Sequence, residues 1–425
     1  MNKITVTQVA PEVECCYVPF DKSKTAQLSV TFYLPLSEDT VSGASLLPFM
    51  LTGCGAGYED MRALNRRLAE LYGASLSCSC NKVADMQVLR MSIESLEGRY
   101  VPDGSDVFFE SAKLLCSLIF DPLVSNGRFE ERNFAREKRL ALERIDGEIN
   151  DKRRFARARC EAEMCLGEPF GIAANGSREG VEQMTAERLY GVWQRLLATA
   201  KVRVSVAAAE SPEHIFKLFA ERFGAVERTP CTLSYSRHVG REEVQHITEP
   251  MPVTQCKLVM GFAFDMTGDD RASYPMMVCT DLFGGGPHSR LFANVREKLS
   301  LCYYCSASAS RRKGVMLVDS GVEAANLERT HDAILEQLEV VKQGGFTDEE
   351  LAASKRSLCE SLRSFYDSGK SIARWYADRV FDDDPLSPDE VRSRIETVTR
   401  EQVMQAAASI QLDTVYRLVP EEAAQ

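Results

Sequence analysis

Apolar and polar residues along the chain form short patterned runs that occur in two similar halves. Residues 28–33 and 257–262 are strand-like runs, one near the start of each half. Residues 74–79 and 303–308 show the alternation that is typical of a strand with one packed face. The pattern therefore predicts a sheet in each half.

Longer segments with helical periodicity follow the strands in each half. Residues 129–159 combine apolar positions with many charges, which predicts an amphipathic helix. Its apolar positions are Phe134, Ile145 and Ile149. Residues 347–364 are the counterpart in the second half, and Asp348 is placed to cap that helix. Runs of strands followed by runs of helices indicate an α+β fold in which a sheet packs against helices.

The end of the first-half helix contains a basic cluster. Its members are Lys152, Arg153, Arg154, Arg157 and Arg159. A patch for acidic partners is one interpretation. Acidic residues surround the cluster, however, and they favour a solvated helix with ion pairs along its face.

Identical residues recur at constant spacing, which indicates a duplicated domain. At an offset of 229, Asn65, Arg67, Ser77 and Ser79 recur as Asn294, Arg296, Ser306 and Ser308. At an offset of 217, Phe129, Ala135, Lys138 and Arg139 recur as Phe346, Ala352, Lys355 and Arg356. Two blocks in the same order with compatible offsets predict that the halves share one fold.

A polar, turn-prone stretch separates the halves. It contains Thr229, Pro230, Ser234, Ser236 and Gly240 together with several charged residues. We therefore expect an N-terminal domain over residues 1–227, a linker over 228–245 and a C-terminal domain over 246–425.

Length and composition narrow the class of protein. At 425 residues the chain is too long for one ordinary core, and 44% hydrophobic with 27% charged residues is typical of a globular protein. A net charge of -11 argues against nucleic-acid binding. No apolar run approaches the ~20 residues of a membrane helix. The first 20 residues include Glu12 and Glu14 and do not resemble a signal peptide, so a cytoplasmic protein is expected.

The 14 cysteines are irregularly spaced, which favours reduced thiols over a disulfide framework. Cys302 and Cys305 form the single C-x-x-C. A redox or zinc role is one interpretation of this motif. A zinc ribbon would need a second such pair, so a buried strand is favoured.

The segment from Gly284 to Tyr303, with its Gly-Gly-Gly-Pro-His-Ser-Arg-Leu-Phe run, resembles the second-domain signature of the pitrilysin/insulinase family of zinc peptidases. The duplicated halves are similar to those of mitochondrial processing peptidase subunits. The resemblance implies two homologous α/β-sandwich domains of the pitrilysin/LuxS-like metallohydrolase fold.

In active members of this family, the resemblance implies a zinc site built from H-x-x-E-H and a later glutamate. The matching positions here are Ser45, Pro48, Phe49 and Arg144. Phenylalanine has no donor atom and proline has no carboxylate, so neither replaces its counterpart. No histidine precedes His214. We therefore expect no metal, no cofactor and no peptide hydrolysis by this chain alone.

A second feature of the family is retained in the second half. Arg296 and Tyr303 match the R-x-x-x-x-x-x-Y spacing of the residues that hold the substrate carbonyl in active relatives. A guanidinium and a phenol are suitable donors to developing negative charge. The alternative is that Arg296 is a surface cation at a helix end and Tyr303 a half-buried strand aromatic.

The resemblance implies a non-catalytic member of a bacterial pair. Its partner would be a pitrilysin-like chain with H-x-x-E-H, and the two chains would bind a peptide or protein substrate. In the absence of that partner, a homodimer is the alternative assembly. Two other classes stay open: a structural or peptide-binding module with no peptidase partner, and an unrelated enzyme.

Overall fold

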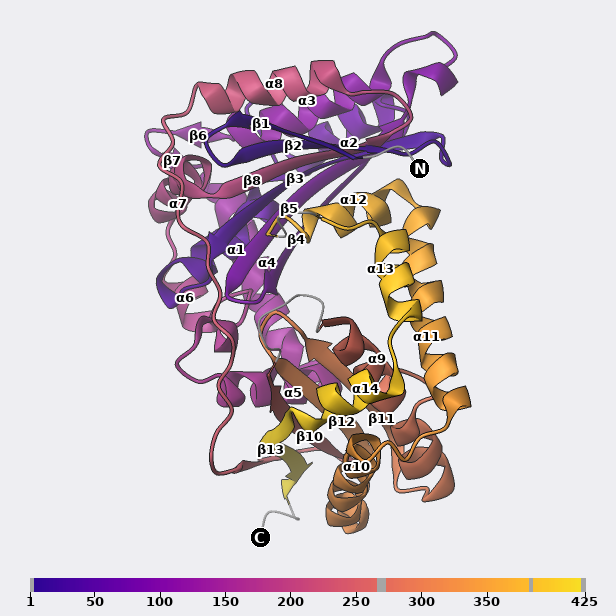
Figure 1. Cartoon of the computed structure of the whole chain (residues 1–425). Helices are drawn as coiled ribbons and strands as arrows, with labels where there is room; N and C mark the ends of the chain where they lie inside the picture. Colours follow the sequence, from indigo (N-terminus) through magenta and orange to yellow (C-terminus); the bar gives the residue numbers. More distant parts are fainter. Residues whose placement is uncertain (1–3, 266–272, 382–384, 422–425) are drawn as a thin grey trace. The chain divides into compact units, whose positions relative to one another are not determined.

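The computed structural model describes residues 4–265, 273–381 and 385–421 (Figure 1). The chain divides into two units, each with one main sheet. The first unit comprises residues 1–146, 172–234 and 364–385, and the second comprises 147–171, 235–363 and 386–425. Among the described helices, none is long and apolar enough to cross a membrane.

The sheet of the first unit has six strands in the order β1-β2-β8-β3-β5-β4. Only β2 and β8 are parallel neighbours, and the other pairs are antiparallel. The strands are β1 (Thr5–Ala10), β2 (Val13–Pro19), β3 (Thr25–Pro35), β4 (Ser75–Val83), β5 (Met86–Leu96) and β8 (Lys201–Ala208). A separate hairpin joins β6 (Val124–Ser125) to β7 (Arg128–Phe129).

Helices cover both faces of this sheet. They are α1 (Glu38–Leu51), α2 (Met61–Glu70), α3 (Val107–Phe120), α4 (Glu131–Gly147), α6 (Arg178–Glu182), α7 (Ala186–Thr199), α8 (Glu213–Gly224) and α12 (Gly369–Ala377). One face of β3 contributes its apolar residues to a core that includes α1, α3 and α7. The opposite face carries Gln27, Ser29, Thr31 and Tyr33, which are also buried because α12 packs on β3 and β8.

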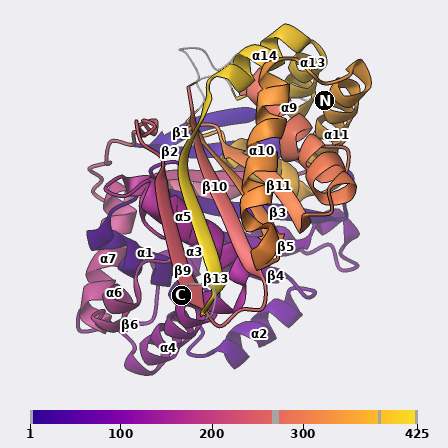
Figure 2. The ribbon, with the colours of Figure 1, turned by 90° about the horizontal axis from the view of Figure 1, so that it is seen from below.

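The second unit has five strands in the order β11-β12-β10-β13-β9. Figure 2 shows β9, β13 and β10 side by side. They are β9 (Gln245–Met251), β10 (Cys256–Phe264), β11 (Cys302–Ser310), β12 (Val315–Val322) and β13 (Ile410–Pro420). The helices are α5 (Lys152–Met164), α9 (Ser273–Gly284), a π-helix (Leu291–Lys298), α10 (Leu327–Lys342), α11 (Asp348–Arg363), α13 (Pro388–Glu396) and α14 (Arg400–Ala408).

The two sheets are copies of one topology. The order β2-β8-β3-β5-β4 in the first unit matches β9-β13-β10-β12-β11 in the second, including the single parallel pair. Arg67 and Arg296 occupy equivalent helices, each directly before an edge strand. The predicted α+β fold with two duplicated halves is therefore confirmed.

Each half of the sequence contributes one helix to the unit formed by the other half. Helix α5, from the first half, packs on β10, β12 and β13, whereas α12, from the second half, packs on β3 and β8. The two helices start at Lys152 and Gly369, which keep the offset of 217. The units therefore contain chain segments exchanged between the two sequence halves.

An ion pair with a strand residue holds each exchanged helix on its sheet. In the second unit, Asp319 of β12 accepts hydrogen bonds from Arg153, at 2.5 Å, and Arg157. In the first unit the charges are reversed: Arg90 of β5 donates to Asp378, at the end of α12, over 2.7 Å. The basic cluster thus lies on an ion-paired helix, but its acidic partner Asp319 is buried in the sheet rather than solvated.

Two local details differ from the sequence expectation. The helix predicted over 129–159 is broken between α4 and α5, because Asp151 accepts a hydrogen bond from the Arg154 amide and starts a new helix. Asp348 is the first residue of α11 rather than its cap. The cap is Thr347, whose side chain and backbone exchange hydrogen bonds with Glu350.

Candidate functional site

The positions expected to have lost a metal site lie together in the first unit. Ser45, Pro48 and Phe49 belong to α1, and Arg144 lies near the end of α4. The Arg144 guanidinium carbon is 3.8 Å from the centroid of the Phe49 ring, a cation–π contact. An aromatic–cation pair therefore occupies two of the four positions, and it offers no ligand atom.

The other two positions are also committed to local structure. The buried Ser45 Oγ lies 2.9 Å from the Ser42 carbonyl and 3.0 Å from the Asn175 carbonyl. Pro48 lies inside the helix, where it has no backbone N–H to donate. The neighbouring Glu143 is exposed and pairs with Arg139 at 2.5 Å, so it does not replace the missing ligand.

Two thiols of β4, Cys78 and Cys80, lie near these positions. Each makes a hydrogen bond within the unit, and burial raises the pKa of each. Cys80 Sγ donates to the Ala174 carbonyl at 3.1 Å, and burial raises the pKa of Cys80 to about 11. Burial also raises the pKa of Cys78, whose sulfur accepts a hydrogen bond from Thr52. Within the described residues of this unit, no three potential ligands cluster closely enough to hold a metal ion.

Arg296 and Tyr303 come together at the edge of the second sheet. Arg296 lies on the π-helix, and its Nε donates to the backbone carbonyl of Tyr303 over 2.9 Å. The guanidinium also packs over the Phe292 ring at 4.3 Å and lies 3.2 Å from Glu297. These contacts fix the guanidinium beside the first residues of β11.

A β-bulge presents the Tyr303 side chain to solvent. The register of β11 with β12 shifts between Cys302 and Tyr304, which leaves Tyr303 as the extra residue. Its side chain is 59% exposed, so it is not the half-buried aromatic of the alternative interpretation. Its hydroxyl donates to Glu323 at 3.0 Å, and this carboxylate raises the pKa of Tyr303, which keeps the phenol protonated.

The site can offer two kinds of donor to an extended peptide. β11 is an edge strand, whose outer backbone groups can pair with an added strand. The guanidinium of Arg296 and the hydroxyl of Tyr303 are suited to a carbonyl oxygen that gains negative charge. Tyr304 belongs to a different environment, since the guanidinium of Arg153 lies 4.2 Å from its ring centroid.

The C-x-x-C residues flank this pair. Cys305 is buried and Cys302 is half-buried, in line with the strand interpretation. A hydrogen bond from the Cys305 thiol lowers the pKa of Cys302 to about 7, and the nearby Arg296 acts in the same direction. Cys302 is therefore the thiol of this site that is ready to ionise near neutral pH.

Sequence reasoning did not identify several residues of these sites. Glu323 and Phe292 hold the Tyr303 hydroxyl and the Arg296 guanidinium, but no sequence spacing marks them. A third group, Cys165, Glu168 and His238, meets in the second unit. The C-x-x-E spacing of its first two members is too common to predict a site without the distant histidine.

Comparisons with known proteins point to one family. A family profile described as the inactive domain of peptidase M16 matches residues 183–358. A probable inactive metalloprotease of Bacillus subtilis, YmfF, is 29% identical over 407 residues, which cover 96% of each chain. A conserved protein from Enterococcus faecalis has a TM-score of 0.91 at 26% identity, over 99% of each chain. A peptidase M16 inactive domain from Pseudomonas fluorescens has a TM-score of 0.81 at 20% identity, over 99% of this chain and 98% of that one.

Proposed function

The chain belongs to the pitrilysin-like M16 peptidase family as a homologue of a probable inactive metalloprotease, and on this premise we propose that it is the non-catalytic, substrate-binding subunit of a two-chain zinc peptidase. One observation carries the proposal. Two of the four positions that match the family metal site are filled by an Arg144–Phe49 stack. In contrast, Arg296 of the π-helix lies beside the exposed Tyr303 of the edge strand β11.

In this proposal a partner with H-x-x-E-H holds the zinc and activates water. The substrate adds an extended strand to β11, and its backbone pairs with the outer edge of the sheet. Arg296 and Tyr303 then donate to the scissile carbonyl as it becomes an oxyanion. The Tyr303 hydroxyl turns from Glu323 to the substrate when the peptide binds.

A second candidate is a structural or peptide-binding module with no peptidase partner. It is favoured by the internal contacts of the pair. Arg296 is bonded to the Tyr303 carbonyl and Glu297, and the Tyr303 hydroxyl is bonded to Glu323. In that role both side chains would stabilise the bulge rather than contact a substrate.

Reconstitution with an H-x-x-E-H chain from the same genome tests the proposal. The two chains should co-elute in size-exclusion chromatography and cleave a quenched fluorescent peptide. Arg296→Ala and Tyr303→Phe should each lower turnover by roughly 10²–10³-fold while the complex still forms. Lys298→Ala, on the same helix, and Tyr304→Phe, the next residue, serve as matched controls.

Thermal melts of each variant show whether the fold is intact. If both Arg296→Ala and Tyr303→Phe keep wild-type turnover, the two side chains do not act on the substrate. Failure of the chain to associate with any such partner, together with peptide binding by the chain alone, would favour the second candidate.

A further inference from the structure

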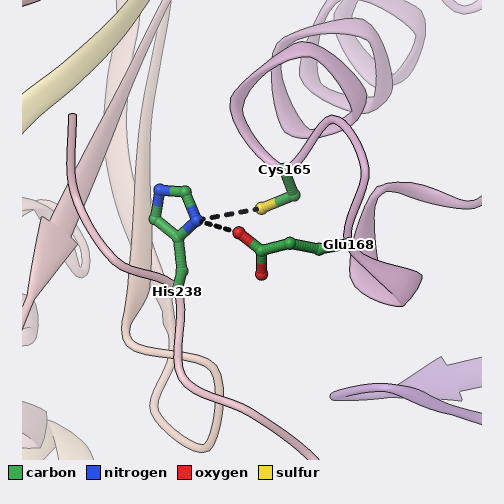
Figure 3. A group of neighbouring side chains, drawn as sticks. All are labelled: Cys165, Glu168 and His238. Carbon is green, nitrogen blue, oxygen red and sulfur yellow. Dashed lines mark hydrogen bonds and ion pairs between the residues drawn. The ribbon is translucent and has the colours of Figure 1, made fainter.

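Three side chains with metal-binding atoms converge in the second unit (Figure 3). His238 Nδ1 lies 2.6 Å from Glu168 Oε1 and 3.9 Å from Cys165 Sγ. The thiol and the imidazole are buried, whereas the Glu168 side chain is partly exposed. A thiol, an imidazole and a carboxylate thus face one point.

The local chain path explains why Cys165 and Glu168 are neighbours. Cys165 ends α5, and the Glu168 amide donates to its carbonyl at 3.0 Å. Gly171 allows the chain to fold back, since a Cβ there would lie only 2.5 Å from the Cys165 carbonyl oxygen. His238 reaches the same point because its backbone N–H donates to the Lys313 carbonyl at 2.8 Å.

A carboxylate on the far side of the imidazole orients it. His238 Nε2 lies 3.2 Å from Asp413 Oδ2. Asp413 is itself buried and accepts hydrogen bonds from Thr414, at 2.7 Å, and from the Arg241 amide, at 2.9 Å. In the structure Nδ1 is hydrogen-bonded to Glu168. With a metal ion bound, the proton on Nε2 would stay directed at Asp413, and the lone pair of Nδ1 would be available to the ion. This carboxylate–histidine arrangement is typical of histidines that bind metal ions.

The surrounding charge suits a divalent cation. Lys313 is fully buried, and its ammonium lies 2.6 Å from Glu168 Oε2. With a metal bound, the cation and Lys313 supply three positive charges. The Cys165 thiolate, Glu168 and Asp413 supply three negative charges. Arg241 adds a partly exposed guanidinium 3.6 Å from Asp413, where solvent screens it. The buried centre would therefore carry no net charge.

We propose that Cys165, Glu168 and His238 form a site for a borderline-soft divalent metal ion, with zinc as the expected occupant. Calcium and magnesium prefer sets of oxygen ligands, whereas thiolate and imidazole together favour zinc. Tetrahedral zinc needs ligand atoms about 3.3–3.6 Å apart, given its usual bond lengths. The Nδ1–Sγ distance of 3.9 Å is close to this. The partly exposed Glu168 would have to withdraw, so that its distance to Nδ1 increases from 2.6 Å to about 3.3 Å.

The proposed site shares no residue with the positions of the first unit that match the family metal site. We expect a metal ion bound here to stabilise the fold. The site ties the end of the exchanged helix α5 to the segment before β9, and through Asp413 to β13. Metal binding would hold α5 against its sheet more firmly.

Cobalt substitution tests the proposal without any peptidase assay. The chelator-treated full chain should bind one equivalent of Co²⁺ and show a thiolate-to-cobalt charge-transfer band, which one equivalent of Zn²⁺ removes. Cys165→Ser should abolish the band. Cys160→Ser is the matched control, because Cys160 is a buried thiol of the same helix directed at the Val259 carbonyl, and it should keep the band. Asp413→Asn should weaken Zn²⁺ binding by roughly 10–100-fold.

The same titration contains the results that would overturn the proposal. A band that persists in Cys165→Ser, or that disappears in Cys302→Ser, would assign the thiolate to another cysteine. Absence of any band in the wild-type chain would also reject the site. If Cys165→Ser fails to fold by circular dichroism, Glu168→Gln decides the outcome. This partly exposed position should then show at least ~10-fold weaker Zn²⁺ binding.

Discussion

The two copies of the fold use the same edge helix in different ways. In the first copy, Arg67 of α2 pairs with Glu110 at 3.1 Å and Glu70 at 3.4 Å. In the second copy, Arg296 of the π-helix holds the carbonyl of the exposed Tyr303. At the offset of 229, the first copy has the buried Ala74 where the second has Tyr303. The two copies therefore share one strand order, whereas the edge helix, the bulge in β11 and a few side chains differ between them.

The ion pairs of the two exchanged helices, α5 and α12, can be compared in the same way. Substitution in these pairs gives the largest expected change in the free energy of unfolding. Asp319 is 1% exposed and receives both Arg153 and Arg157. Asp319→Ala should lower the free energy of unfolding by about 1.5–3 kcal/mol, because the buried carboxylate loses its charged hydrogen bonds to two partly exposed guanidinium groups. Asp378→Ala, in the other copy, should cost at most ~1 kcal/mol, because its carboxylate is partly exposed. Urea unfolding followed by circular dichroism measures both, and equal losses would remove this contrast.

Substitution of Arg296 and of Arg67 by lysine tests whether only the second copy contributes an arginine to turnover. In the two-chain complex, Arg296→Lys should lower turnover by roughly 10–100-fold, because a point charge cannot reproduce the planar fork that donates to an oxyanion. Arg67→Lys should leave turnover within about twofold, since it only changes a surface ion pair. An equal loss at both positions would mean that the arginines share a structural role.

A thiol beside the pair has no equivalent in the first copy, where Gly73 corresponds to Cys302. Because the Cys302 pKa is lowered to about 7, its alkylation should accelerate as pH rises through about 7. Cys305→Ala removes the hydrogen-bond donor, which should return the pKa toward about 8.5 and slow labelling at pH 7 by about 10-fold. Cys305→Ser keeps a donor and should retain most of the rate.

Iodoacetamide labelling of the Cys302 peptide, followed by mass spectrometry over a pH series, measures this difference. An unchanged pH profile in Cys305→Ala would show that the Cys305 thiol does not lower the Cys302 pKa.

Arg144, one of the positions that match the family metal site, should respond least to substitution. Arg144→Ala removes an exposed cation–π contact with Phe49, which should cost about 0.5–1 kcal/mol and leave the turnover of the complex unchanged. Arg139→Ala, on the same helix, is the control for loss of a surface charge. A drop in turnover for Arg144→Ala alone would return a functional role to this locus.

The sequence predicted the duplicated fold because identical residues kept their offsets through both copies. It also identified Phe49 and Arg144 as positions without ligand chemistry, but not that the two side chains stack. The Arg144–Phe49 contact depends on the position of the end of α4. The approach of His238 to Cys165 likewise depends on the position of the end of α5. The break between those helices depends on one cap, Asp151, which the continuous amphipathic pattern does not mark.

The exchanged helices have a consequence for a chain that emerges from the ribosome N-terminus first. The first sheet is complete at Ala208, but α12 begins at Gly369, roughly 160 residues later, or about 10–30 s at usual rates of synthesis. During that interval the face of β3 with Gln27, Ser29 and Thr31 is open to water, which its polar side chains tolerate.

The second sheet has the opposite order of events. Helix α5 is already made when β10 appears. Apart from Asp319, the face that it covers is largely apolar, with Val259, Ala263 and Leu317 in one core with Met164. The polarity of each covered face therefore follows the time at which its helix leaves the ribosome. We expect the polar face of the first sheet to limit aggregation of the nascent chain before α12 is made. For the second sheet, we expect α5 to cover the apolar face as soon as its strands are made.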